Sequence, residues 1–155
     1  MPNEIRVFLE RQNVLVDVEA RCKREALGRL AAHASRQLDL DETKLIDALN
    51  DREQLGTTAI GHGIALPHAK VEIGHLWGML ARLSRPVDFD ALDDKPVDLL
   101  FLLLAPAEAT AEHLKALSRI ARFVRSPDAQ QALRGAHDAN ALYGLAIGEI
   151  DARAA

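Results

Sequence analysis

Cysteine is nearly absent from the 155-residue chain, and this scarcity limits what can hold the fold together. Cys22 is the only one, so no disulfide can form within the chain, which is typical of proteins from a reducing compartment. We interpret Cys22 as an ordinary residue at the start of a helix rather than as a nucleophile. The first residues also lack the basic and then apolar pattern of a secretory signal peptide. Together these absences predict a cytoplasmic protein.

Long hydrophobic runs and an excess of positive charge are missing as well. The longest apolar run, residues 99–105, is too short to span a bilayer, so no membrane insertion is expected. The formal net charge is −4, whereas a protein whose main partner is nucleic acid usually carries a basic patch, so no nucleic-acid partner is expected. The chain also contains no internal repeat and no Gly/Ser-rich linker. We therefore expect a single domain over residues 1–155.

Hydrophobic periodicity indicates alternating strands and helices. Strands are predicted over 13–18, 76–83 and 97–104, and the last is a nearly continuous apolar run typical of a strand covered on both faces. Helices are predicted over 22–38, from directly after Asp39 to about 53, over 108–125 and 127–135, and from about 138 onward. Asp39 and Glu42 resemble an N-cap and its capping-box partner, and Ser126-Pro127 resembles a helix start. The alternation favours an α/β fold with one sheet and helices over it, and leaves the strand order open.

Residues 56–70 depart from this regular pattern. Glycines give irregular backbone, residues 64–66 form a short apolar strand, and Pro67 ends it just before His68. A strand that ends in Pro-His would set the imidazole at the lip of the sheet, on backbone stiffened by proline. That lip is where open α/β folds commonly carry their chemistry. We therefore take His68 as the centre of a candidate site.

His113 is the best partner for His68 in the sequence. The apolar strand leads the chain to the edge of the sheet, and the following helix brings His113 back near its first turn. With Thr110 as N-cap, His113 is the third helical residue, where free N–H groups and the helix dipole favour an anion. His113 also shares a helical face with Leu117, which Leu114 widens, so its ring should point toward the sheet. The two histidines are expected to meet across a crevice.

The remaining histidines have ordinary interpretations. His33 lies at the edge of a helical stripe, and His75 and His137 lie in polar turns, so packing or solvated roles are expected. His62, between two glycines, is either a loop residue or part of the site. The spacing of His62, His68 and His75 matches neither structural zinc sites nor the HExxH pattern, and no cysteine pair accompanies them. No metal site is therefore expected.

A pair of neutral imidazoles beside a glycine-rich loop suits phosphoryl transfer. A neutral imidazole has one nitrogen with a lone pair that can attack phosphorus, and its ordinary pKa of about 6.5 keeps it mostly neutral at cytoplasmic pH. The protein must then position the phosphoryl group and supply donors to its oxygens. Thr57 and Thr58 offer hydroxyls. Arg52 offers a forked guanidinium, although an exposed charge at a helix end is the simpler interpretation of this residue.

Residues 50–68 carry a long ordered motif, in which Arg-Glu is followed by Gly, two hydroxyl residues, Gly-x-Gly and finally Pro-His. This block resembles the active-site block of enzyme IIA proteins of the bacterial phosphotransferase system, in the fructose/mannitol branch that includes the nitrogen-regulatory IIA proteins. Residues 89–101 and 106–118 also resemble this family. The resemblance therefore covers nearly the whole chain.

The resemblance implies an α/β fold with a mixed sheet flanked by helices, the mannitol-type IIA fold. It implies that His68 is the phosphorylated nucleophile and that His113 assists it. The residues that it implies for the phosphate pocket are Arg52, Thr57 and Thr58. It also implies that the phosphoryl donor is a phosphohistidine on an HPr-like phosphocarrier protein. Neither a metal nor a nucleotide cofactor is implied for the IIA protein itself.

A few positions depart from the family pattern, and two roles stay open. Thr57 stands where serine is common, which keeps the hydroxyl, and His62 stands where asparagine is common, which would add a titratable group beside the site. One role is a nitrogen-branch regulator that controls target proteins by its phosphorylation state. The other is a stand-alone fructose/mannitol-type component that passes phosphate to a IIB domain for sugar uptake. Because no IIB or membrane domain accompanies these residues, we favour the regulator.

Overall fold

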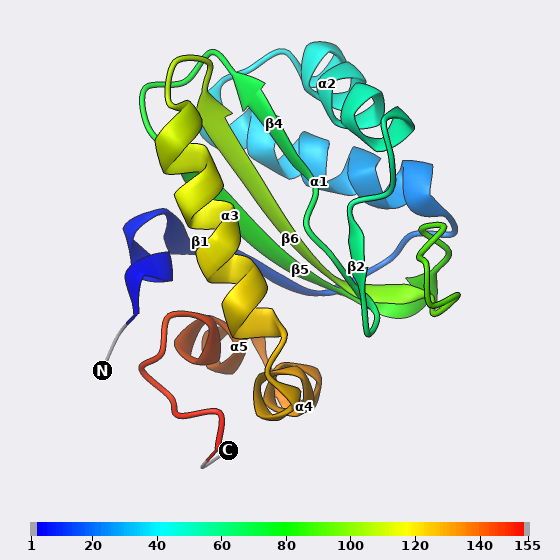
Figure 1. The fold of residues 1–155 in the computed structure, drawn as a ribbon, viewed down its shortest axis with the longest axis vertical. Helices are drawn as coiled ribbons and strands as arrows, with labels where there is room; N and C mark the ends of the chain where they lie inside the picture. Colours follow the sequence, from blue (N-terminus) through cyan, green and yellow to red (C-terminus); the bar gives the residue numbers. More distant parts are fainter. Residues whose placement is uncertain (1–2, 154–155) are drawn as a thin grey trace.

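The computed structural model describes residues 3–153 and contains a mixed sheet with helices on both faces (Figure 1). The helices are a short 3₁₀ helix Glu4–Val7, α1 Lys23–Leu38, α2 Glu42–Gln54, α3 Thr110–Val124, α4 Pro127–Gly135 and α5 Ala139–Ala146. The strands are β1 Leu9–Val18, β2 Ala59–Gly61, β3 Ile64–Ala65, β4 His68–Val71, β5 Trp77–Val87 and β6 Val97–Pro106. The predicted α/β class is confirmed, and the predicted domain bounds of 1–155 extend beyond the described residues.

β6 is the strand around which the sheet is arranged. The strand order is β1-β5-β6-β3-β2, and β4 also pairs with β6. β5 runs antiparallel to β6, whereas β3 and β4 run parallel to it and β1 runs parallel to β5. β2 and β3 form an antiparallel hairpin. The sheet is therefore mixed, as the resemblance to the IIA family implied.

The unbroken apolar run of β6 is explained by helices on both sides of the sheet. Leu99, Phe101 and Leu103 belong to the core shared with α3, α4 and α5. Leu100 and Leu102, which alternate with them, belong to the core shared with α1 and α2. All of these side chains are at most 2% exposed. The strand is thus covered on both faces, as the run predicted, and Figure 1 shows the two helical layers.

The start of α2 differs from the sequence-based expectation. Asp39 does not cap α2: it ends α1 in the left-handed conformation, with φ 54° and ψ 48°. A short acidic residue tolerates this conformation at a helix end better than most side chains do. The cap is Asp41, whose carboxylate accepts a hydrogen bond from the Lys44 N–H at 3.1 Å.

The start of α3 also differs. Its N-cap is Ala109 rather than Thr110, without a side-chain capping bond. His113 is therefore the fourth helical residue, and its N–H is already bonded to the Ala109 carbonyl at 2.9 Å. The expectation of a free N–H group at His113 is wrong. His113 lies on the buried face of α3 as predicted, whereas Leu114, expected on the same face, is 61% exposed.

The other predicted elements are present with shifted ends. The strand predicted over 13–18 is part of the longer β1, and the strand predicted over 76–83 is β5, which continues to Val87. α4 begins as predicted, with Ser126 as N-cap and Pro127 in its first turn. Across residues 3–153, none of the helices combines the length and the apolar character that crossing a membrane requires.

Replacement of Asp41 by alanine should lower the free energy of unfolding by about 1 kcal/mol, because the Lys44 N–H loses its cap. Asp39→Gly is the matched control. Glycine adopts the left-handed conformation at least as easily as aspartate, so the stability of this variant should be unchanged or slightly raised. Urea unfolding followed by circular dichroism measures both variants. Parental stability in Asp41→Ala would contradict the assignment of the cap.

Candidate active site

His68 is the first residue of β4 and not a residue beyond the end of a strand. β3 ends at Ala65, and the ladder with β6 resumes at His68 in an unchanged register, three residues further along both strands. Pro67 has no N–H to give to the ladder, but its carbonyl still accepts from the Leu103 N–H at 3.0 Å. The predicted position at a strand end is therefore wrong, because the proline interrupts the strand without ending it.

The partners of the two ring nitrogens of His68 fix its tautomer. Nδ1 lies 2.8 Å from the carbonyl oxygen of Leu66, which can only accept, so Nδ1 carries the hydrogen and donates it. Nε2 accepts a hydrogen bond from the Nε–H of Arg52 at 3.2 Å. Both contacts leave the lone pair on Nε2. The nitrogen of His68 that can act as a nucleophile is therefore Nε2.

Arg52 lies in the last turn of α2 and is half-buried. Besides its contact with His68, it donates from Nη1 to the Gly56 carbonyl at 2.8 Å. The guanidinium is thus held between the imidazole and the loop that follows α2. The simpler interpretation of Arg52 as an exposed charge is wrong. Because an arginine has five N–H donors, this side chain can still donate to an anion placed at Nε2 of His68.

The ring of His113 meets the ring of His68, as predicted. The ring centroids are 5.4 Å apart and the planes make an angle of 75°, an edge-on contact. His113 is 6% exposed, and its Nε2 is buried without a hydrogen-bond partner within the described part of the chain. A buried polar nitrogen without a partner costs free energy. Such a nitrogen suits a group that gains its partner when a substrate arrives.

Burial keeps both imidazoles neutral near pH 7. It lowers the pKa of His68 below its ordinary value, and the charge of Arg52 adds to this effect, while the hydrogen bond to Leu66 opposes it. Burial also lowers the pKa of His113, with smaller contributions from His68 and Lys70. Nε2 of His68 therefore keeps its lone pair unprotonated at neutral pH, where it accepts the hydrogen bond from Arg52.

The hydroxyls of Thr57 and Thr58 are engaged with other groups of the protein. Thr57 donates to the carbonyl of Phe89 and accepts from the Ala59 N–H. Thr58 is 5% exposed and donates to the carboxylate of Glu53. Each hydroxyl must turn away from its present acceptor before it can donate to a phosphate. The place of both residues in a phosphate pocket stays a prediction.

Glu53 is a buried carboxylate of this region to which the sequence analysis gave no role. It is 9% exposed, and it accepts from the Thr58 N–H at 3.1 Å and from the Lys23 ammonium at 3.0 Å. The one feature of the sequence that points to Glu53 is its position directly after Arg52 in the 50–68 block. Neighbouring residues of a helix face different sides, so that signal does not give the contacts.

His62 lies away from the site, at the tip of the β2–β3 hairpin. It is exposed and has a φ of 58°, and Gly63 follows with 77°, as a type I′ turn requires. The Gly63 carbonyl accepts from the Leu99 N–H. Leu99 precedes Leu103, the pairing partner of His68, by four residues on β6, which is about 13 Å of strand. The expectation that His62 adds a titratable group beside the site is wrong.

The other histidines also lie outside the site. Nε2 of His33 lies 2.9 Å from the side-chain oxygen of the buried Asn13, which confirms a packing role. His75 and His137 are exposed, as expected. Within residues 3–153, no group of three or more His, Cys, Asp or Glu side chains is placed to hold a metal ion.

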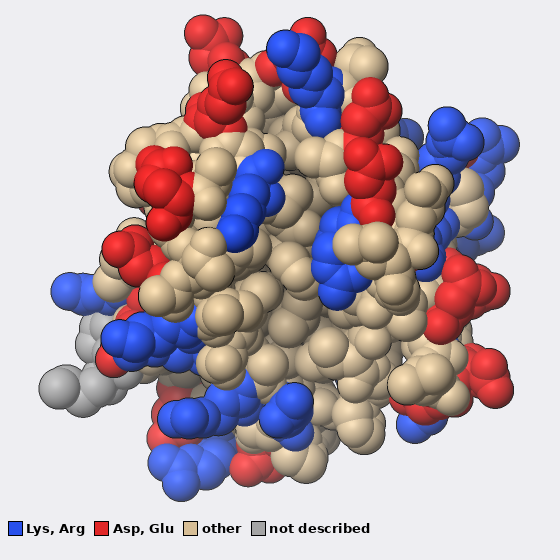
Figure 2. All heavy atoms as spheres, turned by 45° about the horizontal axis from the view of Figure 1, so that its top comes forward, with Lys and Arg blue, Asp and Glu red and all other residues tan. Residues whose placement is uncertain are grey.

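The surface around His68 and His113 combines apolar and cationic side chains. Leu55, just beyond α2, is 84% exposed, and Leu114, which follows His113, is 61% exposed. Figure 2 views the molecule toward the upper ends of β4 and α3 in Figure 1. It shows an uncharged region with Lys and Arg side chains on both sides of it and acidic side chains along the upper rim. Such a surface suits contact with another protein.

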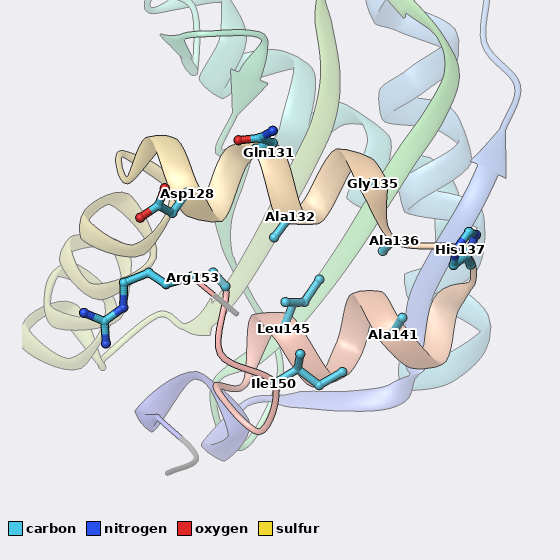
Figure 3. A pocket seen from close by; sticks show the side chains of 11 residues that line it. Asp128, Gln131, Ala132, Gly135, Ala136, His137, Ala141, Leu145, Ile150 and Arg153 are labelled. Carbon is cyan, nitrogen blue, oxygen red and sulfur yellow. The ribbon is translucent and has the colours of Figure 1, made fainter. Parts of the chain in front are cut away.

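A cavity of about 510 Å³ lies elsewhere, between α4, α5 and the C-terminal segment (Figure 3). Leu145 and Ile150 line its apolar part, and Asp128 and Arg153 lie at one end. His68, like every other predicted site residue, is absent from its lining. The cavity is therefore separate from the candidate active site.

Comparison with known proteins identifies relatives over most of the chain. Residues 7–146 match the family model described as "Phosphoenolpyruvate-dependent sugar phosphotransferase system, EIIA 2". A nitrogen regulatory protein of Bradyrhizobium diazoefficiens is 46% identical over 133 residues, which cover 85% of this chain and 87% of that protein. A fructose-specific EIIA component of Haloferax volcanii is 41% identical over 110 residues, 70% of each chain.

Solved structures show the same fold. The crystal structure of the nitrogen regulatory protein IIA-Ntr from Neisseria meningitidis matches with a TM-score of 0.86 at 30% identity, over 90% of this chain and 97% of that one. The IIA mannitol protein of Escherichia coli matches with a TM-score of 0.75 at 20% identity, over 89% of this chain and 98% of that one. The second match bears on the fold alone and confirms the mannitol-type architecture.

The lowered pKa values of His68 and His113 predict a stability that depends on pH. Unfolded histidine titrates near 6.5, so below that pH the unfolded chain binds more protons than the folded one. The free energy of unfolding should therefore fall as the pH drops from about 6.5 toward the folded-state values, and His113→Gln should make this fall shallower. Urea unfolding across the pH range measures the slope, and NMR titration gives the midpoints. Midpoints at or above 6.5 would contradict the effect of burial.

Proposed function

The chain belongs to the EIIA 2 family of the phosphoenolpyruvate-dependent sugar phosphotransferase system, and from that membership we propose that it is a phosphotransferase component that accepts a phosphoryl group on His68. The proposed donor is the phosphohistidine of an HPr-like phosphocarrier protein. The observation that carries the proposal is the meeting of His68 and His113, with ring centroids 5.4 Å apart, beside the guanidinium of Arg52.

The transfer step uses the lone pair on Nε2 of His68. This pair forms a bond to phosphorus while the bond between phosphorus and the donor's ring nitrogen breaks, and the bonding electrons return to that nitrogen. As the new bond forms, positive charge develops on the His68 ring. The hydrogen bond from Nδ1 to the Leu66 carbonyl then strengthens, because its donor becomes more acidic. Neither a metal nor a nucleotide takes part in the step.

Arg52 changes partner during the step. Its Nε–H now donates to Nε2 of His68, the atom that must attack. When the phosphoryl group arrives, the guanidinium turns to the phosphoryl oxygens and offers the donors that their charge attracts. Arg52 therefore covers the nucleophile in the free protein and supports the transferred group in the phosphorylated one.

His113 assists as a hydrogen-bond donor and is not the acceptor. Its Nε2 lies buried and unpartnered within the described residues, close to the ring of His68. The tautomer with the hydrogen on Nε2 would donate to a phosphoryl oxygen, and this bond would strengthen as charge develops on the transferring group. Thr57 and Thr58 complete the proposed phosphate pocket once their hydroxyls turn from the Phe89 carbonyl and the Glu53 carboxylate.

The proposed partners are proteins, since the phosphoryl group arrives on a carrier. The exposed Leu55, just beyond α2, and Leu114, next to His113, offer apolar contact to such a partner. The cationic side chains around this region in Figure 2 would favour a partner with complementary charge. A donor that draws on phosphoenolpyruvate works in the cytoplasm, so we also propose a cytoplasmic location. The proposed domain extends over residues 1–155.

Two roles follow from the two kinds of relative. The nitrogen regulatory protein at 46% identity favours a regulator that controls target proteins by its phosphorylation state, and this is the role that we propose. The fructose-specific component at 41% identity favours the alternative, in which the protein passes phosphate to a IIB domain. Incubation of the phosphorylated protein with purified fructose- and mannitol-type IIB domains distinguishes them. Rapid and complete transfer to a IIB domain would support sugar uptake over regulation.

Phosphorylation assays separate the roles of the two histidines. With phosphoenolpyruvate, enzyme I and an HPr-like carrier, His68→Ala should take up no phosphate because the nucleophile is gone. His113→Ala should still be phosphorylated, but about 10²–10³-fold more slowly, because one donor to the developing charge is lost. Rapid-quench kinetics with the parent and both variants measures these rates, and circular dichroism checks their folding. His33→Ala is a control away from the site and should react at the parental rate.

Two outcomes would overturn these assignments. A parental protein whose phosphate maps to a residue other than His68 would remove the proposed nucleophile. A folded His113→Ala variant that accepts and returns phosphate at parental rates would remove the assisting role.

A further inference from the structure

A series of hydrogen bonds connects the start of α1 to the ring of His68. Lys23 donates to one oxygen of Glu53 at 3.0 Å, and the other oxygen accepts from the N–H of Thr58 at 3.1 Å and from its hydroxyl. The Thr58 carbonyl accepts from the Leu66 N–H at 2.9 Å. The Leu66 carbonyl in turn accepts from Nδ1 of His68 at 2.8 Å.

We propose that Glu53, held by Lys23, is a positioning residue that sets the orientation and the tautomer of His68 through Thr58 and Leu66. The inference rests on the proposed function, in which Nε2 of His68 attacks phosphorus. Glu53 acts through other residues and has no contact with the reacting nitrogen. Its task is to hold the backbone of Leu66, whose N–H bonds to Thr58, so that the Leu66 carbonyl meets Nδ1 and the lone pair stays on Nε2.

Burial makes the Glu53 carboxylate a strong constraint. Its side chain is 5% exposed and that of Lys23 is 22% exposed, and a buried carboxylate is stable only when it is paired and hydrogen-bonded. With Lys23 on one oxygen, the other oxygen accepts from the backbone N–H of Thr58 in a charge-assisted hydrogen bond, which is stronger than a neutral one and remains in place when the hydroxyl turns to a phosphate. Thr58, and with it the backbone that bonds to Leu66, is thereby fixed against the end of α2.

The last turn of α2 is then connected by hydrogen bonds to both ring nitrogens of His68. Arg52 donates directly to Nε2. Glu53, the next residue, acts on Nδ1 through Thr58 and Leu66. Because both side chains leave the same helix end, a shift of this turn relative to β4 would disturb both hydrogen bonds of the ring together. The Lys23–Glu53 pair joins α1 to the same turn and opposes such a shift.

Lys23 has a second carboxylate partner that supplies a matched control. It also contacts Asp90 at 3.2 Å, and the side chain of Asp90 is 80% exposed. An exposed pair of this kind contributes little to structure. Asp90 has a left-handed backbone with φ 56°, which asparagine tolerates, so Asp90→Asn removes the charge without strain. If the proposal is correct, this variant should behave as the parent.

The test compares Glu53→Gln and Lys23→Met with Lys23→Arg and Asp90→Asn. The first readout is the ¹⁵N chemical shifts of Nδ1 and Nε2 of His68 in the unphosphorylated protein, which report its tautomer without any transfer. The second is the rate of phosphorylation by the HPr-like carrier across pH. Glu53→Gln and Lys23→Met should lower the fraction with hydrogen on Nδ1 and slow phosphorylation by about 10- to 100-fold, since the nucleophile is misplaced. Lys23→Arg keeps the charge and should restore both readouts.

The ¹⁵N shifts of His68 decide between a positioning role and a purely structural role for Glu53. Parental ¹⁵N shifts in folded Glu53→Gln and Lys23→Met would overturn the proposal, even if phosphorylation slows. If Glu53→Gln fails to fold, the shifts of Lys23→Met against those of Lys23→Arg decide alone. Failure of the proposed function has a different signature: the parent would take up no phosphate on His68, while the shifts in the unphosphorylated protein would still test the positioning role.

Discussion

The hydrogen bond from Nδ1 of His68 to the carbonyl of Leu66 is the interaction on which the proposed chemistry depends. A carbonyl can only accept, so this contact places the hydrogen on Nδ1 and the lone pair on Nε2. The contact is made where Pro67, which has no N–H, separates β3 from β4, and the Leu66 carbonyl just before the proline meets the ring two residues later. Burial then keeps the ring neutral by lowering its pKa. The local backbone fixes the tautomer and burial fixes the charge state, and both make Nε2 the nucleophilic nitrogen.

β6 brings the parts of the site together. β3 and β4 lie along one side of this strand, which sets the position of His68, and α3 follows β6 directly and packs back over the sheet, which sets the position of His113. The end of α2 adds Arg52 from the direction of β4. The site therefore needs residues from distant parts of the chain, yet each is fixed by a buried element and not by a free loop. This arrangement holds the two rings in edge-on contact before any substrate arrives.

The sequence predicted the longer helices and strands and the meeting of the two histidines, but it gave no strand at β2 or β4. Its errors lie where contacts between distant segments determine the structure. The apolar run of β6 and the N-cap of α4 are local signals, and both predictions are confirmed. The pattern favours Asp39 as a cap of α2 because an aspartate at the left-handed end of α1 resembles one at the start of the next helix. The family pattern favours His62 beside the site, whereas the β2–β3 hairpin pairs with β6 about 13 Å of strand from the partner of His68, a separation that has no signature in composition. The contacts of Glu53 depend on Lys23, which is distant in the sequence, so no spacing rule reveals them.

The central claim is that Nε2 of His68 is the atom that accepts the phosphoryl group. The most direct test is NMR of the ¹⁵N-labelled protein after phosphorylation by phosphoenolpyruvate, enzyme I and the HPr-like carrier. A one-bond coupling between ³¹P and ¹⁵N identifies both the residue and the ring nitrogen. The account predicts this coupling at Nε2 of His68, with Nδ1 still carrying its hydrogen. A coupling at Nδ1, or at any other residue, would contradict it.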